Sequence, residues 1–368
     1  MSFKIHEKQK KIFDLLQVES SWRYTQGNDK IIIGVIDTGF DFFHPDLKKN
    51  IIPGYYNNCG YHTETYEITA HGTMVASLIA ANSERNGIKG LVPNCKILSA
   101  STGMIKNDFL IFYKDFFKKH PNEMKKFQEE LANKKEFDSY AINHVNYFSN
   151  AISDAIIYLT DKNVKVINIS SKLSLSAIEN DIVKNKLLSA FEYAKNHNVL
   201  IITSSGNNSE LRDDYPGNKD TVMVCGAILD DDKRWETITE FQGGKIKMGS
   251  DYGSRLSVMA PVENLLVCAP HERRFYKIKN GPSGDFTYKY AGNHIVSPNG
   301  ATSLAAPIVT SLAALLLSIE PDLKISEIID LIQNGCVKVS DNKQEYGFGR
   351  INFYNSVKLL LDGRKNEI

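Results

Sequence analysis

The sequence predicts an α/β fold in which a mostly parallel, twisted β-sheet carries helices on both faces. Two observations predict it. Near-continuous apolar segments recur along the chain, which is the pattern of strands buried on both faces of a sheet. Segments with helical spacing separate them, and strands that alternate with helices form parallel sheets through right-handed crossovers.

The first half of the chain supplies two helices and two strands in this scheme. Residues 7–22 carry apolar side chains at the spacing of a short amphipathic helix. Residues 30–37 form an apolar run that ends in Asp-Thr-Gly and suits a buried strand. Residues 71–81 repeat apolar side chains every three or four positions, as a helix does, and residues 96–99 are a short candidate strand.

The second half continues the alternation. Residues 164–170, Val-Lys-Val-Ile-Asn-Ile-Ser, have the β-branched content of a strand, and residues 181–196 have the period of an amphipathic helix. Residues 199–204 form a strand that Gly-Asn-Asn halts. Two further short strands are expected at 221–228 and 256–259, and a long apolar helix at 303–319.

Residues 104–150 differ from the rest of the chain. Aromatic residues give way to many lysines and glutamates, so we expect a charged helical hairpin inserted between two core elements. It is either a solvated decoration or a lid or specificity element. We expect one domain over residues 23–360, preceded by an N-terminal extension over residues 1–22.

Composition narrows the classes of function. Hydrophobic residues make up 42% of the 368, and the net charge is +1 from 44 basic and 43 acidic side chains, which gives no support for a nucleic-acid or membrane partner. Residues 1–16 lack the apolar core of a secretory signal, and the apolar stretch 311–319 is too short to span a bilayer. Five scattered cysteines without CxxC spacing indicate free thiols in a reducing compartment, which we expect to be the cytoplasm.

Three short segments present an acid, a base and a hydroxyl in that order. Asp37 ends an apolar strand, His71 begins His-Gly-Thr, and Ser303 follows Gly-Ala-Thr at a helix start. Nucleophilic catalysis needs these three groups to converge. The order excludes the α/β-hydrolase pattern, in which a G-x-S-x-G serine precedes the acid and the histidine. The pattern predicts a hydrolase of peptide bonds.

With their flanking segments, these residues resemble the subtilisin-like serine protease family over residues 20–357. The other matching segments include His44-Pro45-Asp46-Leu47, Gly90-Leu91-Val92-Pro93, Ser205-Gly206-Asn207, Tyr215-Pro216-Gly217, Ala260-Pro261 and Tyr346-Gly347-Phe348-Gly349-Arg350-Ile351-Asn352. The resemblance implies a subtilisin-like three-layer fold. It implies that Asp37 orients His71, and that His71 is the base for the nucleophile Ser303.

The resemblance also assigns Asn207 as the side-chain donor to the oxyanion; the alternative is an asparagine in a left-handed turn. Ala301 replaces the usual glycine and would be strained if that position needs positive φ. Pro307 is expected in the first helical turn, where its missing N–H costs nothing. Met74 stands where a second histidine is common, and it is expected to pack.

The segments that would hold the substrate follow from the same resemblance. The residues expected to bind the substrate are Ser170, Ser171, Lys172, Ser205, Gly206 and Asp214. Asp214 aligns with the floor of the pocket for the residue before the cut, so a Lys or Arg preference is expected. Two alternatives remain: Lys172 pairs with Asp214 and cancels the preference, or Asp213-Asp214 is an exposed turn.

No cofactor is required for the chemistry, but the family implies a structural calcium ion. The candidate ligands are Asp46, Asn82, Glu84, Asn86 and Ile88, because calcium prefers carboxylate and carbonyl oxygens. The alternative is a polar turn rich in asparagine and glycine.

Secreted members of the family carry a folded pro-domain, and only 36 residues precede Asp37, too few for one, so the chain resembles the intracellular branch of the family. The leading hypothesis is therefore an intracellular serine endopeptidase that processes a peptide or protein. Residues 1–16 are then expected to lie across the cleft and restrain activity. General protein turnover is the alternative within the enzyme class. The alternative of another class is a catalytically weak protein that holds a peptide in the same cleft.

Overall fold

The computed structural model describes residues 5–56, 71–83, 87–102, 134–241, 244–269, 272–275, 286–289, 295–298 and 300–365. A seven-stranded sheet runs through its centre, and every neighbouring pair of strands is parallel. The strand order is β2 (Ile51–Tyr56), β3 (Lys96–Ser101), β1 (Ile32–Asp37), β4 (Val166–Ile169), β5 (Leu200–Ser204), β6 (Val222–Ile228) and β9 (Leu256–Pro261). The expected α/β class is therefore confirmed.

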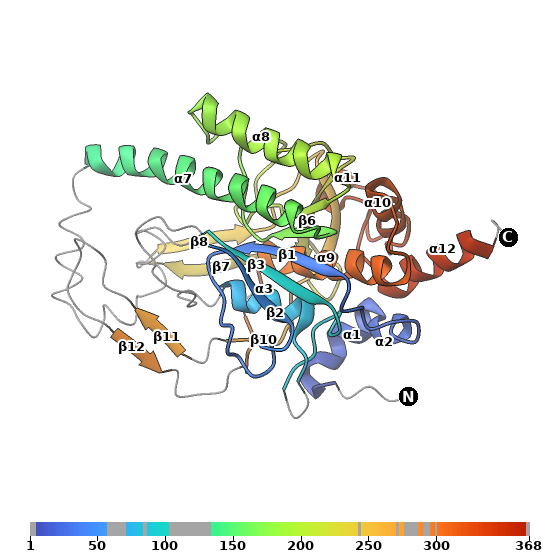
Figure 1. Cartoon of the computed structure of the whole chain (residues 1–368). Coiled ribbons are helices and arrows are strands. Elements are labelled where there is room, and N and C mark those ends of the chain that lie inside the picture. Colours follow the sequence, from blue (N-terminus) through green and yellow to red (C-terminus); the bar gives the residue numbers. More distant parts are fainter. Residues whose placement is uncertain are drawn as a thin grey trace.

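Helices cover both faces of the sheet and make three layers (Figure 1). Helices α3 (His71–Ala80) and α9 (Thr302–Ile319) pack on one face, and α7 (Lys134–Asp161) and α8 (Asp181–Asn196) on the other. Alternate strand residues explain this arrangement, because Ile202 faces the first helix pair and Ile201 the second. Helix α8 has the bounds that the sequence predicted.

Smaller elements surround this framework. They are the N-terminal η1 (Glu7–Gln9), α1 (Lys10–Leu16) and α2 (Val18–Ser21); the antiparallel pairs β7 (Glu236–Phe241) with β8 (Gly244–Gly249), β10 (Val267–Cys268) with β13 (Ile295–Val296), and β11 (Glu272–Phe275) with β12 (Phe286–Lys289); and the C-terminal α10 (Ile325–Asn334), α11 (Lys343–Tyr346) and α12 (Phe353–Lys365). The sequence pattern predicted none of the antiparallel pairs, which are short or lack a regular apolar period.

The boundary expected at residue 150 does not exist. Helix α7 continues from Lys134 to Asp161 without interruption, and its second half is core, with Ile152 and Ile156 fully buried against the sheet. The helix is thus the crossover that carries the chain from β3 to parallel β4. Residues 104–133 of the expected insertion lie outside the described residues.

The N-terminal segment is part of the main core, so the expected extension is not a separate piece. Phe13 and Leu16 are buried in the same cluster as α3 and α9, and the Trp22 indole donates to the Leu91 carbonyl at 2.9 Å. Leu91 follows the carboxyl end of α3, opposite the end where His71 begins the helix. Residues 5–16 therefore do not lie across the catalytic cleft.

Helix α9 is the central helix of the domain. Its 18 residues extend well beyond the apolar stretch 311–319. By length and composition alone it could cross a membrane, but 89% of it is buried within the protein. Pro307 lies inside this helix and beyond its first turn, which corrects the expected position. Its missing N–H leaves the Ser303 carbonyl without the usual donor four residues on.

Candidate active site

Asp37 and His71 form a close pair at one end of the sheet. Asp37 is the last residue of β1, and His71 is the first residue of α3. The His71 Nδ1 atom lies 2.8 and 2.9 Å from the two oxygens of the Asp37 carboxylate. The carboxylate is 1% exposed and the histidine 28%, so the ring is held from its buried side and presents Nε2 as its reactive nitrogen.

Backbone groups fix this pair. The Thr38 N–H donates to Asp37 Oδ1 at 2.7 Å, which gives the buried carboxylate a second donor. Gly72 lets α3 approach closely, because a Cβ there would lie 2.1 Å from the Gly39 carbonyl oxygen. The glycine beside the base is therefore required by close packing.

Ser303 lies in the first turn of α9 and is 8% exposed. The chain enters this helix through Gly300, whose φ of 35° and close contact with the Trp235 indole leave no room for a side chain. Ala301 has φ −170°, ordinary extended backbone, so the expected strain at this position is absent.

Asn207 is oriented by Thr302, the residue before Ser303, which the sequence did not indicate as part of the site. Both the backbone N–H and the hydroxyl of Thr302 donate to the Asn207 side chain, at 2.9 and 2.8 Å, so the accepting atom is the amide oxygen. The amide nitrogen then faces away as a donor. Gly206 takes the positive φ of 111° and Asn207 does not, so the left-handed-turn alternative is wrong. The position of Thr302 directly before Ser303 in the sequence could have indicated that it belongs to the site.

The helices bring these groups to one region. Helices α3 and α9 pack together, with Val75 and Ile308 in one buried cluster, so His71 and Ser303 lie in the first turns of neighbouring helices. The Asn207–Thr302 bonds join the end of β5 to the start of α9. All of these residues lie at or beyond the carboxyl ends of parallel strands, where α/β sheets place their sites.

The substrate segments predicted from the sequence follow β4 and β5. Ser170 is buried, and its hydroxyl accepts from Asn168 at 2.9 Å. The Ser171 carbonyl accepts from the Thr203 hydroxyl at 3.2 Å, which ties this segment to β5 just before Ser205 and Gly206.

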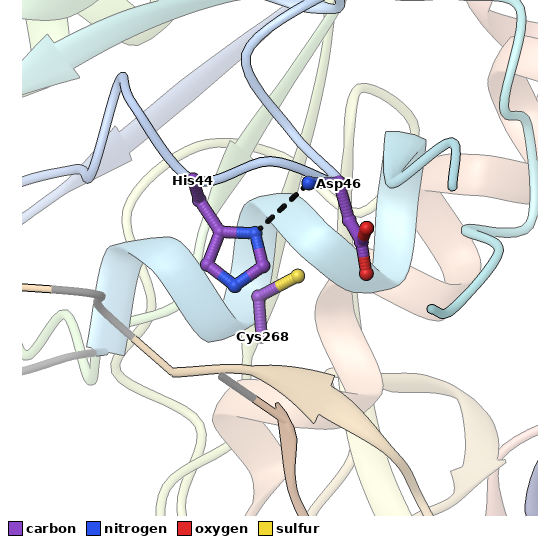
Figure 2. Close-up of side chains that lie close together, drawn as sticks. All are labelled: His44, Asp46 and Cys268. Carbon is purple, nitrogen blue, oxygen red and sulfur yellow. Dashed lines mark hydrogen bonds between the residues drawn. The ribbon is translucent and has the colours of Figure 1, made fainter. Parts of the chain in front are cut away.

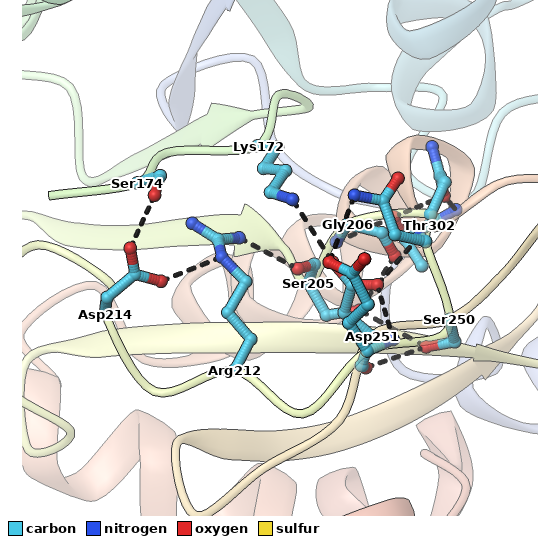
Figure 3. A network of polar contacts seen from close by, with 12 residues as sticks. Lys172, Ser174, Ser205, Gly206, Arg212, Asp214, Ser250, Asp251 and Thr302 are labelled. Atoms are coloured by element: carbon cyan, nitrogen blue, oxygen red, sulfur yellow. Dashed lines mark hydrogen bonds and ion pairs between the residues drawn. The ribbon is translucent and has the colours of Figure 1, made fainter. Parts of the chain in front are cut away.

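The expected role of Asp214 is not supported, because its charge is already engaged. The Arg212 Nε atom lies 2.8 Å from one carboxylate oxygen, and the Ser174 hydroxyl donates to the other (Figure 3). The Ser176 hydroxyl donates to that second oxygen as well. Burial alone would raise the pKa of Asp214; the two serine hydrogen bonds and Arg212 outweigh it and lower the pKa to about 2. A cationic substrate side chain would have to displace these donors, and Lys172 pairs with Asp251, not with Asp214.

The contacts of Asp46, Asn82 and Ile88 do not fit the expected calcium site. The ammonium of Lys89 donates to Asn82 Oδ1, the Ile88 N–H to Asp46 Oδ2 at 3.1 Å, and the Ser83 N–H to the Ile88 carbonyl at 3.1 Å. A cationic side chain thus occupies an oxygen that calcium would need. Glu84 and Asn86 lie outside the described residues.

Chelation of calcium is accordingly expected to leave the melting temperature unchanged. The measurement is thermal unfolding followed by circular dichroism. One sample contains about 5 mM EGTA to remove calcium and the other about 5 mM calcium chloride, since a ligand that binds the folded state raises the melting temperature. A rise of several degrees in calcium would contradict the expectation and restore the metal site.

A second group of potential metal ligands lies near Asp46. His44, Asp46 and Cys268 place one ligand atom each within 4.8 Å of one another (Figure 2). The His44 Nδ1 atom accepts the Asp46 N–H at 3.2 Å, so the neutral ring carries its proton on Nε2, the nitrogen a metal would need. Burial raises the pKa of the Cys268 thiol well above its usual value, which disfavours the thiolate. The group is consistent with a hydrogen-bonded core.

Comparison with known proteins agrees with this geometry. A model of the subtilase family matches residues 28–349. The chain is 28% identical to the thermophilic serine proteinase of Bacillus sp. strain AK1, covering 92% of this chain and 64% of that protein. It is 26% identical to fervidolysin of Fervidobacterium pennivorans, covering 92% and 41%.

The chain therefore spans about two-thirds or less of these two relatives. Among solved structures, the prenylagaramide maturation protease PagA superposes with a TM-score of 0.58 at 19% identity, covering 93% of this chain and 98% of that one. The family match covers most of the sequence, including the strand that ends in Asp37 and the helix whose first turn contains Ser303. The chain belongs to the subtilase family.

Proposed function

We propose that the protein is a serine endopeptidase that cleaves peptide bonds through an acyl-enzyme intermediate. The observation that carries the proposal is the Asp37–His71 pair at the start of α3, beside α9, whose first turn contains Ser303. Ser303 Oγ attacks the scissile carbonyl while His71 Nε2 takes its proton, and His71 then protonates the leaving amine. Water, deprotonated by His71, releases the acid and restores Ser303.

Two groups stabilise the oxyanion of each tetrahedral intermediate. The Asn207 amide nitrogen, free to donate because its oxygen accepts from Thr302, supplies one hydrogen bond. The first turn of α9 supplies the Ser303 backbone N–H and the positive end of the helix dipole, whereas the Thr302 and Leu304 N–H groups already donate to Asn207 and Ala301.

The role we assign is processing of a defined peptide or protein. Its support is the fold shared with PagA, a protease named for maturation of prenylagaramide. The charged side chains around Gly206 also favour a restricted choice of substrate. The thiols of Cys95, Cys225, Cys268 and Cys336 are free, which supports action in a reducing compartment such as the cytoplasm.

A catalytically weak peptide-binding protein remains the second candidate, and a fluorophosphonate probe separates the two. Such a probe forms a covalent adduct only with an activated serine. We expect one adduct per chain by intact mass, absent in Ser303→Ala and retained in Ser326→Ala, a change at an exposed serine of α10. Absence of an adduct, or an adduct on another serine, would refute the proposal.

A further inference from the structure

Lys172 and Asp251 meet across the segments proposed to hold the substrate. Lys172 follows Ser170 and Ser171 after β4, and Asp251 lies beside Gly206 (Figure 3). The Lys172 Nζ atom is 3.8 Å from Asp251 Oδ2, too far for a hydrogen bond, and this buried oxygen has no hydrogen-bond partner in the described part of the chain.

Gly206 shows how closely Lys172 approaches the catalytic groups. A Cβ added at Gly206 would lie 3.4 Å from Lys172 Cδ and 2.1 Å from Asp251 Oδ2. The aliphatic stem of Lys172 therefore packs on the residue just before Asn207. The Lys172 side chain therefore lies between the segments after β4 and β5, which the family resemblance assigns to substrate binding.

Arg212 lies buried behind the same two segments. Its Nη1 donates to the Ser205 carbonyl at 3.1 Å and its Nη2 to the Leu173 carbonyl, so the guanidinium joins the segment after β5 to the segment after β4. Its Nε holds Asp214. A long basic side chain would meet this cation in place of a free carboxylate.

Exposure decides which charge a substrate meets first. The Lys172 side chain is 37% exposed, whereas Asp214 is 28%, Arg212 7% and Asp251 0%. Asp251 Oδ1 is held by the N–H groups of Asn208 and Glu210, at 2.7 and 3.2 Å. Burial raises the pKa of Asp251, although the Asn208 and Glu210 N–H groups and the charge of Lys172 act against this shift.

The geometry points to Lys172 as a specificity-determining residue that selects a glutamate or aspartate immediately before the scissile bond. An ammonium without a short partner gains a charge-assisted hydrogen bond from a substrate carboxylate. A lysine or arginine at that position would be repelled by the more exposed Lys172. This inference rests on the proposed endopeptidase function.

Peptidyl diphenyl phosphonates test the selection without knowledge of the natural substrate. They phosphonylate only an activated serine and so mimic the acylation step. Their side chain occupies the site of the residue before the scissile bond. We expect the glutamate analogue to inactivate the enzyme about 10-fold faster than the glutamine analogue, and the lysine analogue to be slowest. Lys172→Met should abolish the difference between glutamate and glutamine, and Lys172→Arg should retain it.

Lys186→Met is the matched control, since Lys186 on α8 is 38% exposed and pairs with Asp154. It should keep the wild-type ratio. Equal rates for glutamate and glutamine analogues in the wild type, a faster lysine analogue, or an unchanged ratio in Lys172→Met would each overturn the inference. Failure of the generic fluorophosphonate to react would refute the proposed function instead, so the two failures are distinguishable. Circular dichroism verifies that each variant is folded.

Discussion

Ser303→Ala is expected to lower kcat on the order of 10⁶-fold, because it removes the atom that forms the acyl-enzyme. Binding should survive, since the oxyanion donors and substrate segments remain. Ser303 is small, and alanine is a good helix former at this site in the first turn of α9, so the melting temperature should stay close to that of the wild type. The measurement is steady-state cleavage of a peptide identified by mass spectrometry of a digested library.

His71→Ala supplies the internal check on this result. If His71 acts only by moving protons for Ser303, the double variant should be no slower than either single variant, because the two residues function as a unit. Losses that multiply in the double variant would show that the residues act separately. A Ser303→Ala protein that retains more than about a hundredth of wild-type kcat would contradict the assignment of the nucleophile.

Asn207→Ala is expected to lower kcat about 10²- to 10³-fold with little change in KM. The amide nitrogen of Asn207 is proposed to meet the oxygen only after it becomes negative, so its loss affects the transition state more than the bound substrate. The Thr302 groups that now donate to the Asn207 oxygen would also lose their acceptor. Steady-state kinetics on the same peptide gives both parameters.

Asn208→Ala is the matched control for this change. Asn208 is the next residue, its side chain is exposed and bonds only weakly to Glu210 at 3.3 Å, and its role at Asp251 is played by the backbone N–H. Its kcat should stay within about twofold of the wild type, as surface substitutions usually do. A loss carried by KM alone in Asn207→Ala would place this residue in substrate binding and not in oxyanion stabilisation.

The main framework could be predicted from the sequence because each element carries its own periodic signal. The strand that ends in Asp37 is apolar because both faces of the sheet are covered, and α8 begins after Asn180, whose side-chain oxygen accepts the Ile182 N–H of the first turn. The segment around Ser303 combines a glycine, a hydroxyl pair and a long apolar helix, which together indicate both the site and its support.

The errors share a different origin. Asp214 is separated by one residue from Arg212, yet nothing in the sequence indicates that the guanidinium turns toward this carboxylate and the carbonyls of Leu173 and Ser205. Lys89 could equally have pointed into solvent, but it binds Asn82. The direction in which a charged side chain points depends on neighbours that are distant in the sequence. The number and order of charged residues therefore do not predict it.

The sequence by itself therefore determined the parallel framework and the chemical types at its carboxyl edge, because periodicity and glycine-flanked motifs are local properties. Only the tertiary structure decided which charges cancel: Asp214 is paired with Arg212, while Lys172 stands 3.8 Å from Asp251 and faces the substrate segments. The physical reason is that electrostatic interactions depend on distance and burial in space, and these are fixed when segments from separate strands pack together.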